Sequence, residues 1–183
     1  MNLRRLAIPE VLVFEPQTFR DDRGWFRVLS SQDQLASLGF HQTFVQDNLS
    51  FSRRGVLRGL HWQVPVPQGK LVTCITGQVF DVAVDIRPDS PTLGQWVAET
   101  LDAEQGNSIY VPPGFAHGFL VLSDEAHVLY RNTTGYIADG QRSLRYDAPE
   151  LGIQWPDPGA PIRLSPKDEQ AIDWATYLAN PTA

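Results

Sequence analysis

The sequence has a single cysteine among its 183 residues. One cysteine excludes an internal disulfide and a metal site built from several cysteines. Cys74 lies in an apolar, strand-like run, and small apolar-like thiols in such runs usually fill the core. We therefore expect Cys74 to pack in the interior and not to act as a nucleophile.

Long apolar runs and an excess of basic residues are also missing. No run approaches the roughly 18 residues of a membrane-spanning helix, and the N-terminus has two arginines but no apolar segment of a secretory signal. The formal net charge of −6 argues against a nucleic-acid surface, which needs a basic face, although a few arginines in one pocket can still bind phosphate. We expect a cytoplasmic protein with no nucleic-acid or membrane partner.

Short alternating segments dominate the chain. Between Phe80 and Arg87, apolar residues at even positions alternate with Asp81, Ala83 and Asp85, which predicts a strand with one buried side. Lys70–Thr76 is predicted to be its hairpin partner, with the turn at Gly77. Further strands are predicted at Val11–Glu15, Trp25–Ser30, Phe44–Leu49, Val56–Gln63, Gln95–Leu101, Ser108–Val111, Phe119–Leu122 and His127–Asn132. So many short strands predict an all-β sandwich or barrel.

Helix signals are few. Ser31 to Leu38, closed by Gly39, could form a short helix. The segment from Ser165 to Asp168 has an N-cap serine, a proline at the first helical position and an acidic third residue, which predicts a helix through about Thr176. Because no repeat, low-complexity tract or linker interrupts the chain, we expect residues 1–183 to form one domain.

Two histidines lie in informative surroundings. Gly106, Pro112, Gly114 and His117 fit the pattern G-x5-P-x-G-x2-H, which resembles the second motif of the cupin superfamily. The first cupin motif supplies two histidines to a metal, but the corresponding stretch here is Gly59–Gln63, with glutamine in the second position. Two isolated imidazoles make a poor divalent-metal site. We therefore expect acid–base chemistry without a metal or another cofactor.

Several longer sequence motifs are more specific than the cupin pattern. They are Phe44–Ser50, Gly55–His61, Gln68–Val72, Asp81–Arg87, Ser90–Trp96, Pro113–Phe119 and the tyrosine pair Tyr130 and Tyr136. In this order they resemble the dTDP-4-dehydrorhamnose 3,5-epimerase family from about Phe19 to Asp168. The resemblance implies a cupin-type double-stranded β-helix, a jelly-roll barrel with a few short helices. It also implies a dTDP-sugar substrate and a homodimer with exchanged N-terminal strands.

The resemblance assigns the catalytic roles. Epimerisation of a 4-keto sugar at C3 and C5 removes a proton beside the ketone, leaves an enolate and returns a proton on the other face. His61 would be the base, Lys70 the cation beside the enolate oxygen and Tyr130 the acid on the opposite face. Asp168 would be the partner of His61. Histidine titrates near neutral pH, and lysine and tyrosine offer donors where negative charge develops. Asp168 could instead serve only the helix cap, and His117, which the resemblance places in the pocket, could only bond the backbone.

Arg23, Phe26, Gln46, Asn48 and Arg58 are assigned by the same resemblance to the nucleotide diphosphate and its base. Arginine suits a diphosphate because its planar fork donates two parallel hydrogen bonds, although Arg23 could equally be a solvated turn residue. Strict alternation would place Arg58 and His61 on opposite sides of one strand. We therefore predict a bulge or bend at Gly59 between them.

Two positions depart from the family pattern: Val28 and, in a looser alignment, Gln141 stand where the family carries glutamates. The sugar product and the nucleotide contacts are therefore open. The alternatives are an epimerase acting at only C3 or only C5, a cupin that binds a sugar nucleotide without converting it, and a metal-dependent cupin enzyme.

Overall fold

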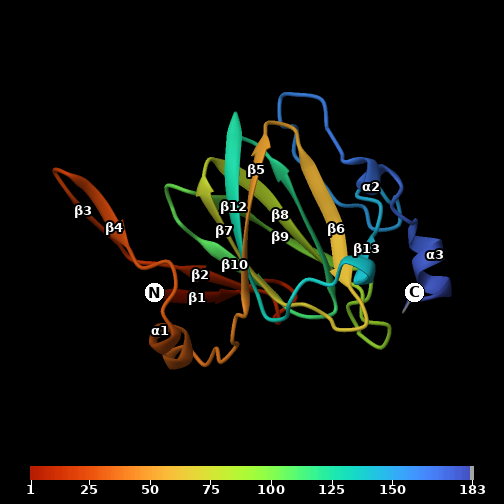
Figure 1. The fold of residues 1–183 in the computed structure, drawn as a ribbon, viewed down its shortest axis with the longest axis horizontal. Coiled ribbons are helices and arrows are strands. Elements are labelled where there is room, and N and C mark those ends of the chain that lie inside the picture. Colours follow the sequence, from red (N-terminus) through yellow and green to blue (C-terminus); the bar gives the residue numbers. More distant parts are fainter. Residues whose placement is uncertain (182–183) are drawn as a thin grey trace.

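The computed structural model describes residues 1–181 and is built mainly from strands (Figure 1). The strands are β1 (Asn2–Arg5), β2 (Leu12–Glu15), β3 (Thr18–Asp21), β4 (Gly24–Arg27), β5 (Gln46–Arg53), β6 (Leu57–Gln63), β7 (Lys70–Thr76), β8 (Gln78–Asp85), β9 (Trp96–Asp102), β10 (Ser108–Val111), β11 (Phe115–Val121), β12 (Glu125–Asn132) and β13 (Gln141–Ser143). The helices are α1 (Gln32–Ser37), α2 (Pro166–Glu169) and α3 (Trp174–Ala179), and Ala138–Gly140 forms a 3-10 turn.

Two antiparallel sheets form the body. The six-stranded sheet has the order β1-β2-β10-β7-β12-β5, and the five-stranded sheet has the order β13-β6-β11-β8-β9. Consecutive strands such as β5 and β6, or β7 and β8, belong to different sheets, so the chain crosses repeatedly between the two layers. This is the winding of a jelly roll, and it confirms the predicted fold class.

The crossing between sheets overturns two expectations. Lys70–Thr76 has the predicted bounds but is not the hairpin partner of β8: β7 pairs with β10 and β12, and β8 pairs with β11 and β9. Gly77, at φ +78°, turns the chain from one sheet to the other. β8 is also buried on both faces, because Val79 and Ala83 face the core between the sheets while Val82 and Val84 pack under the C-terminal segment.

The predicted C-terminal helix is interrupted. Its start is correct, since the Ser165 side chain caps α2 by accepting from the Asp168 backbone N–H, but α2 ends at Glu169 and a separate α3 begins at Trp174. Together with the segment from Leu144 to Trp155, this region covers the outer face of the five-stranded sheet. Cys74 lies in the core between the sheets, as predicted.

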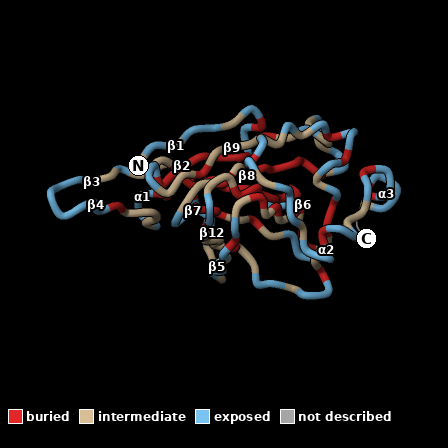
Figure 2. The backbone as a smooth tube through the Cα atoms, turned by 90° about the horizontal axis from the view of Figure 1, so that it is seen from above, coloured by how far each residue is buried: buried red, intermediate tan, exposed pale blue. Residues whose placement is uncertain are grey.

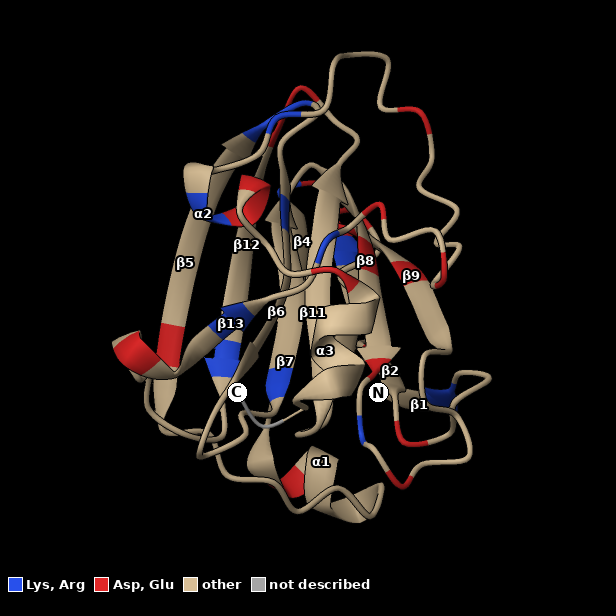
Figure 3. Ribbon diagram, turned by 90° about the vertical axis from the view of Figure 1, so that its right-hand side faces the viewer, with Lys and Arg blue, Asp and Glu red and all other residues tan. Residues whose placement is uncertain are grey.

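A hairpin made of β3 and β4 projects from the body (Figure 1), and its backbone is exposed over most of its length (Figure 2). The predicted single strand Trp25–Ser30 is therefore shorter and belongs to this arm. Acidic and basic segments are scattered over the ribbon (Figure 3). No helix within residues 1–181 combines the length and the apolar character that crossing a membrane requires.

Candidate active site

A cavity of about 260 Å³ lies between the two sheets. Its lining residues come from both sheets and from the loops that follow β6 and β12: Asn48, Ser50, Arg58, His61, Trp62, Gln63, Gln68, Lys70, His117, Phe119, Tyr130, Asn132, Tyr136 and Gln141. The cavity thus brings together three of the four residues predicted to be catalytic. The fourth, Asp168, lies behind His61.

A bulge in β6 brings Arg58 and His61 to the same cavity. In the pairing with β11, His61 stands opposite His117 and Arg58 opposite Phe119, so two residues of β6 span one residue of β11. Gly59 has φ +107°, and a Cβ on it would lie 2.5 Å from the His117 carbonyl oxygen. The register shift predicted at Gly59 is confirmed, and only glycine fits this close approach.

His61 is paired with a buried carboxylate. Its Nε2 lies 2.5 Å from Asp168 Oδ1, while Ser165 Oγ donates to Asp168 Oδ2 at 2.8 Å. An ionised carboxylate can only accept, so Nε2 carries a proton and the lone pair of neutral His61 is on Nδ1. Asp168 therefore contacts the helix cap through its backbone N–H and His61 through its side chain, so the geometry of both readings is present.

The surroundings of His61 favour its neutral form before catalysis. Burial lowers the pKa of His61 below 6.5, and the Asp168 carboxylate opposes this shift. The same pairing with His61, together with Ser165, lowers the pKa of Asp168 despite its burial. At neutral pH the ring is thus an available base whose protonated form a carboxylate can stabilise.

Lys70 and Tyr130 enter from the opposite sheet. The Lys70 ammonium donates to the His61 carbonyl oxygen at 3.5 Å, and burial lowers the pKa of Lys70 to about 8. Tyr130 on β12 contacts Ser50 Oγ through its hydroxyl at 3.2 Å, and burial raises the pKa of this phenol. Tyr130 is therefore protonated at neutral pH, and the imidazole of His61 and this phenol reach the cavity from opposite sheets.

His117 forms a second buried pair that the sequence did not predict. Its Nε2 lies 2.9 Å from both carboxylate oxygens of Asp81, and both side chains are almost completely buried. Burial raises the pKa of Asp81, and the charges of His117 and Lys70 oppose this shift. Asp81 thus orients His117 and lies near the lysine charge. An aspartate flanked by apolar residues within a strand was the signal available in the sequence.

Gln63 occupies the position of the second cupin histidine and holds two loops together. Its Nε2 donates to the carbonyl oxygens of Val66 and Gly135, and its Oε1 accepts from the Ile137 backbone N–H. Its polar atoms are committed to backbone groups of the loops that rim the cavity. No cluster of three potential metal-ligating side chains occurs within residues 1–181.

Of the predicted binding residues, Asn48 and Arg58 line the cavity and Gln46 adjoins it. Gln46 donates to Asn48 and accepts from the backbone N–H of Tyr136. Arg58 is oriented by Ser52 Oγ at 2.9 Å. Sequence reasoning did not assign Tyr136 a binding role, although its hydroxyl donates to Gln141 Oε1 at 2.9 Å at the rim of the cavity.

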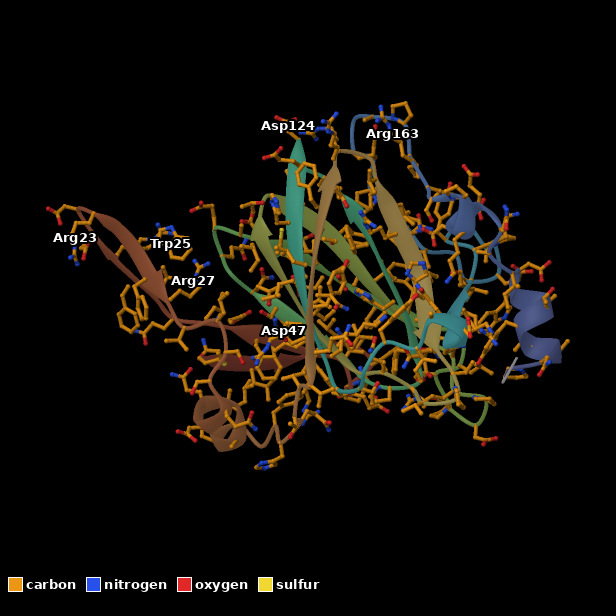
Figure 4. The ribbon with its side chains drawn as sticks, viewed as in Figure 1. Arg23, Trp25, Arg27, Asp47, Asp124 and Arg163 are labelled. Atoms are coloured by element: carbon orange, nitrogen blue, oxygen red, sulfur yellow. The ribbon has the colours of Figure 1, made fainter. Side chains whose placement is uncertain are left out.

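Arg23 and Phe26 lie elsewhere in this chain. Both belong to the projecting hairpin, where Arg23 pairs with Asp21 at 2.7 Å and Phe26 is 66% exposed. Figure 4 shows Arg23 at the far end of the arm, well away from the body. Within one chain, these two residues do not contribute to the cavity.

The model of the dTDP-4-dehydrorhamnose 3,5-epimerase family matches residues 5–176. The chain belongs to this family. An epimerase of this name from Pseudomonas aeruginosa is 51% identical over 178 residues, which cover 96% of this chain and 97% of the relative. The match runs from β1 into α3, so the projecting arm and the segment carrying Asp168 are both part of the epimerase fold.

Solved structures agree with this assignment. The Legionella pneumophila dTDP-6-deoxy-D-glucose-3,5-epimerase in complex with dTDP-4-keto-L-rhamnose is 46% identical, with a TM-score of 0.89 over 93% of this chain and 90% of that one. A 3′-monoepimerase from Streptomyces bikiniensis in complex with dTDP-quinovose is 33% identical, with a TM-score of 0.90 over 97% and 90%. The epimerase fold therefore accommodates relatives named for inversion at two centres and at one.

Replacing Asp168 by Asn tests the pairing with His61 in this epimerase. The amide keeps the backbone cap but offers His61 no negative charge, so we expect kcat to fall about 10²-fold while dTDP affinity stays within twofold. The control is Asp173→Asn, the same change at the exposed cap of α3. Wild-type turnover by D168N would contradict a catalytic role for the pair.

Proposed function

We propose that this chain is a cofactor-independent epimerase that inverts C3 and C5 of dTDP-4-dehydro-6-deoxy-D-glucose to give dTDP-4-dehydro-L-rhamnose. The observation that carries the proposal is the placement of His61 and Tyr130 on opposite sheets around one cavity, with Lys70 beside them. Inversion requires a proton to leave one face of a carbon and another to arrive on the other face, and two facing walls supply this geometry.

The reaction begins at a carbon next to the C4 ketone. Neutral His61 removes the proton, the C–H electron pair forms a C=C bond to C4, and the C4=O π electrons move to the oxygen, which becomes an enolate. The Lys70 ammonium, which lies beside His61, stabilises this charge. Asp168 stabilises the imidazolium that His61 becomes.

Protonation from the opposite wall completes the inversion. Tyr130 gives its phenolic proton to the carbon, the enolate returns to a ketone, and the phenolate regains a proton as His61 loses one. The electron and proton balance is closed, and no redox partner is needed. The same set serves C3 and C5, since both carbons adjoin the C4 ketone.

The pH dependence of kcat/KM follows from the two shifted groups. His61 must be neutral to act as the base, and its pKa lies below 6.5. On the acidic side, kcat/KM should therefore fall only below pH 6.5. The enolate needs a charged lysine, and the pKa of Lys70 is about 8, so activity should fall again as the pH rises past about 8. A rate profile with stopped assays from pH 5 to 10 measures both limbs; a flat profile above pH 9 would remove Lys70 from this role.

The second candidate function is inversion at a single carbon. The likeness to the 3′-monoepimerase supports it. The sequence resemblance adds Val28 and, in a looser alignment, Gln141 as two departures from the family pattern. A binding cupin without turnover and a metal-dependent cupin are further alternatives. The intact acid–base set disfavours the first, and elemental analysis of the purified protein tests the second: a stoichiometric metal would contradict cofactor independence.

A homodimer with exchanged N-terminal strands completes the proposal. It is supported by the projecting arm and by an apolar patch on the outer face of the six-stranded sheet, where Leu49, Phe51 and Ile75 are 65%, 46% and 40% exposed. In a dimer, the arm of one chain could bring Arg23 and Phe26 to the cavity of the other. Light scattering should give twice the chain mass of 20.5 kDa, and fractionation of cells would test the expected cytoplasmic location.

A further inference from the structure

The base of the projecting arm is fixed by one buried guanidinium. Arg27, the last residue of β4, is only 8% exposed. Its Nε donates to Thr18 Oγ1 across the hairpin at 2.9 Å, its Nη1 to the Ala103 carbonyl oxygen at 2.9 Å and its Nη2 to the Glu104 carbonyl oxygen at 2.6 Å. The planar fork of arginine thus connects both arm strands to the turn between β9 and β10.

The turn that receives this guanidinium is shaped for it. Gly106 has φ +69°, and a Cβ there would lie 2.0 Å from Arg27 Nη1. Asn107 holds the turn closed: its Oδ1 accepts from the Asp102 backbone N–H and its Nδ2 donates to the Thr100 carbonyl oxygen. The two acceptor carbonyls are therefore held in place by the turn itself, and glycine leaves the space that the guanidinium occupies.

Arg27 also orders the arm beyond its base. Its Cζ lies 4.4 Å from the centre of the Trp25 ring, so the same group packs against the indole two residues nearer the tip (Figure 4). The arm's ion pair with the body, Arg20 to Glu104, spans 3.8 Å between exposed side chains and contributes little. The direction of the arm depends mainly on the buried contact.

We propose that Arg27 is a positioning residue that locks the β3–β4 arm in the direction needed to present Arg23 and Phe26 to the substrate cavity of a second copy of the chain. The inference rests on the dimeric epimerase proposed above. It adds a residue that touches neither substrate nor cavity but sets how well the partner's site is completed.

Arg27→Met should loosen the arm without touching the acid–base residues. We expect KM for the dTDP-sugar to rise about tenfold, because the arm loses the charged donor that fixes it to the turn. We expect kcat to stay within twofold, because the acid–base residues are unchanged. Arg20→Met is the matched control, since it removes the same charge from the same hairpin. Arg27→Lys should raise KM less than R27M, because its ammonium can still donate to one of the carbonyls, but it should not restore the wild-type KM, because it cannot span both.

Gly106→Ala tests the contact from the other side and should reproduce the KM effect of R27M. Hydrogen exchange in residues 18–27 should accelerate in R27M and G106A but not in R20M, and this readout does not depend on activity. Unchanged KM and unchanged exchange in both variants would overturn the proposal. If the wild-type protein itself fails to epimerise, the proposed function fails, and exchange still reports whether Arg27 orders the arm.

Mixed dimers decide whether the arm acts across the dimer. In a dimer of one R27M chain and one H61N chain, the site with an intact His61 receives the intact arm of its partner. We expect wild-type KM at about half the activity per dimer, because one of two sites is functional. A KM as high as that of R27M alone would show that each arm serves its own chain and would overturn the proposal.

Discussion

His61→Asn is expected to reduce kcat by about 10³-fold, the scale on which a positioned general base contributes. The asparagine amide occupies the space of the ring atoms nearest Cβ and can still form hydrogen bonds, but it has no basic nitrogen. Because His61 Nε2 is held by Asp168, the wild-type ring has one orientation and one lone pair for the substrate. The amide replaces that lone pair with groups that cannot accept a proton at neutral pH.

The measurement is a progress curve at saturating substrate, followed by calorimetric titration with dTDP. We expect dTDP affinity within threefold of wild type, so that the loss is in the chemical step. His41→Asn, at an exposed position outside the cavity, is the control for removing an imidazole. Epimerisation at the wild-type rate in H61N would remove His61 from the mechanism.

Tyr130→Phe should separate proton removal from inversion. His61 remains able to take the proton, and Lys70 remains beside the enolate, so exchange with solvent should persist. Delivery to the opposite face should fall about 10²-fold, because the cavity wall formed by β12 loses its acid. The variant should therefore incorporate deuterium into recovered substrate faster than it forms product.

The ratio of exchange to epimerisation is the quantity to measure, by mass spectrometry in deuterated water. Phe119 and His117 pack around the Tyr130 ring, so the phenylalanine should retain this packing. Tyr146→Phe, which removes a hydroxyl outside the cavity, controls for the change of residue type. If Y130F forms product at the wild-type rate, another group must supply the proton.

Much of the fold was predictable because jelly-roll strands are short and punctuated. The bounds of β7 and β10 were predicted correctly, since glycine and proline flank their apolar runs. The pairing of β7 with β8 was predicted wrongly, because a tight turn in sequence does not reveal whether the chain stays in one sheet or crosses to the other. That choice depends on long-range partners such as β10 and β12.

Site residues were predictable from the sequence where they lie in recognisable motifs. They were less predictable where the role of a side chain depends on whether it is buried. Lys70 and His61 lie within motifs that resemble those of the family, and both line the cavity. Asp81 was assigned to a solvent-facing side because alternation cannot distinguish an exposed carboxylate from one buried against His117. Arg27 gave no signal, since its acceptors are backbone carbonyls some 76 residues away in the chain.

The central claim is that one metal-free acid–base set inverts both carbons beside the ketone. The most direct test is incubation of the wild-type protein with dTDP-4-keto-6-deoxyglucose in deuterated water, followed by assignment of the labelled carbons by NMR. The account predicts deuterium at both C3 and C5 of the product. It predicts the same labelling of the sugar when the protein has first been treated with a chelator. Deuterium at only one carbon, or loss of labelling after chelation, would contradict it.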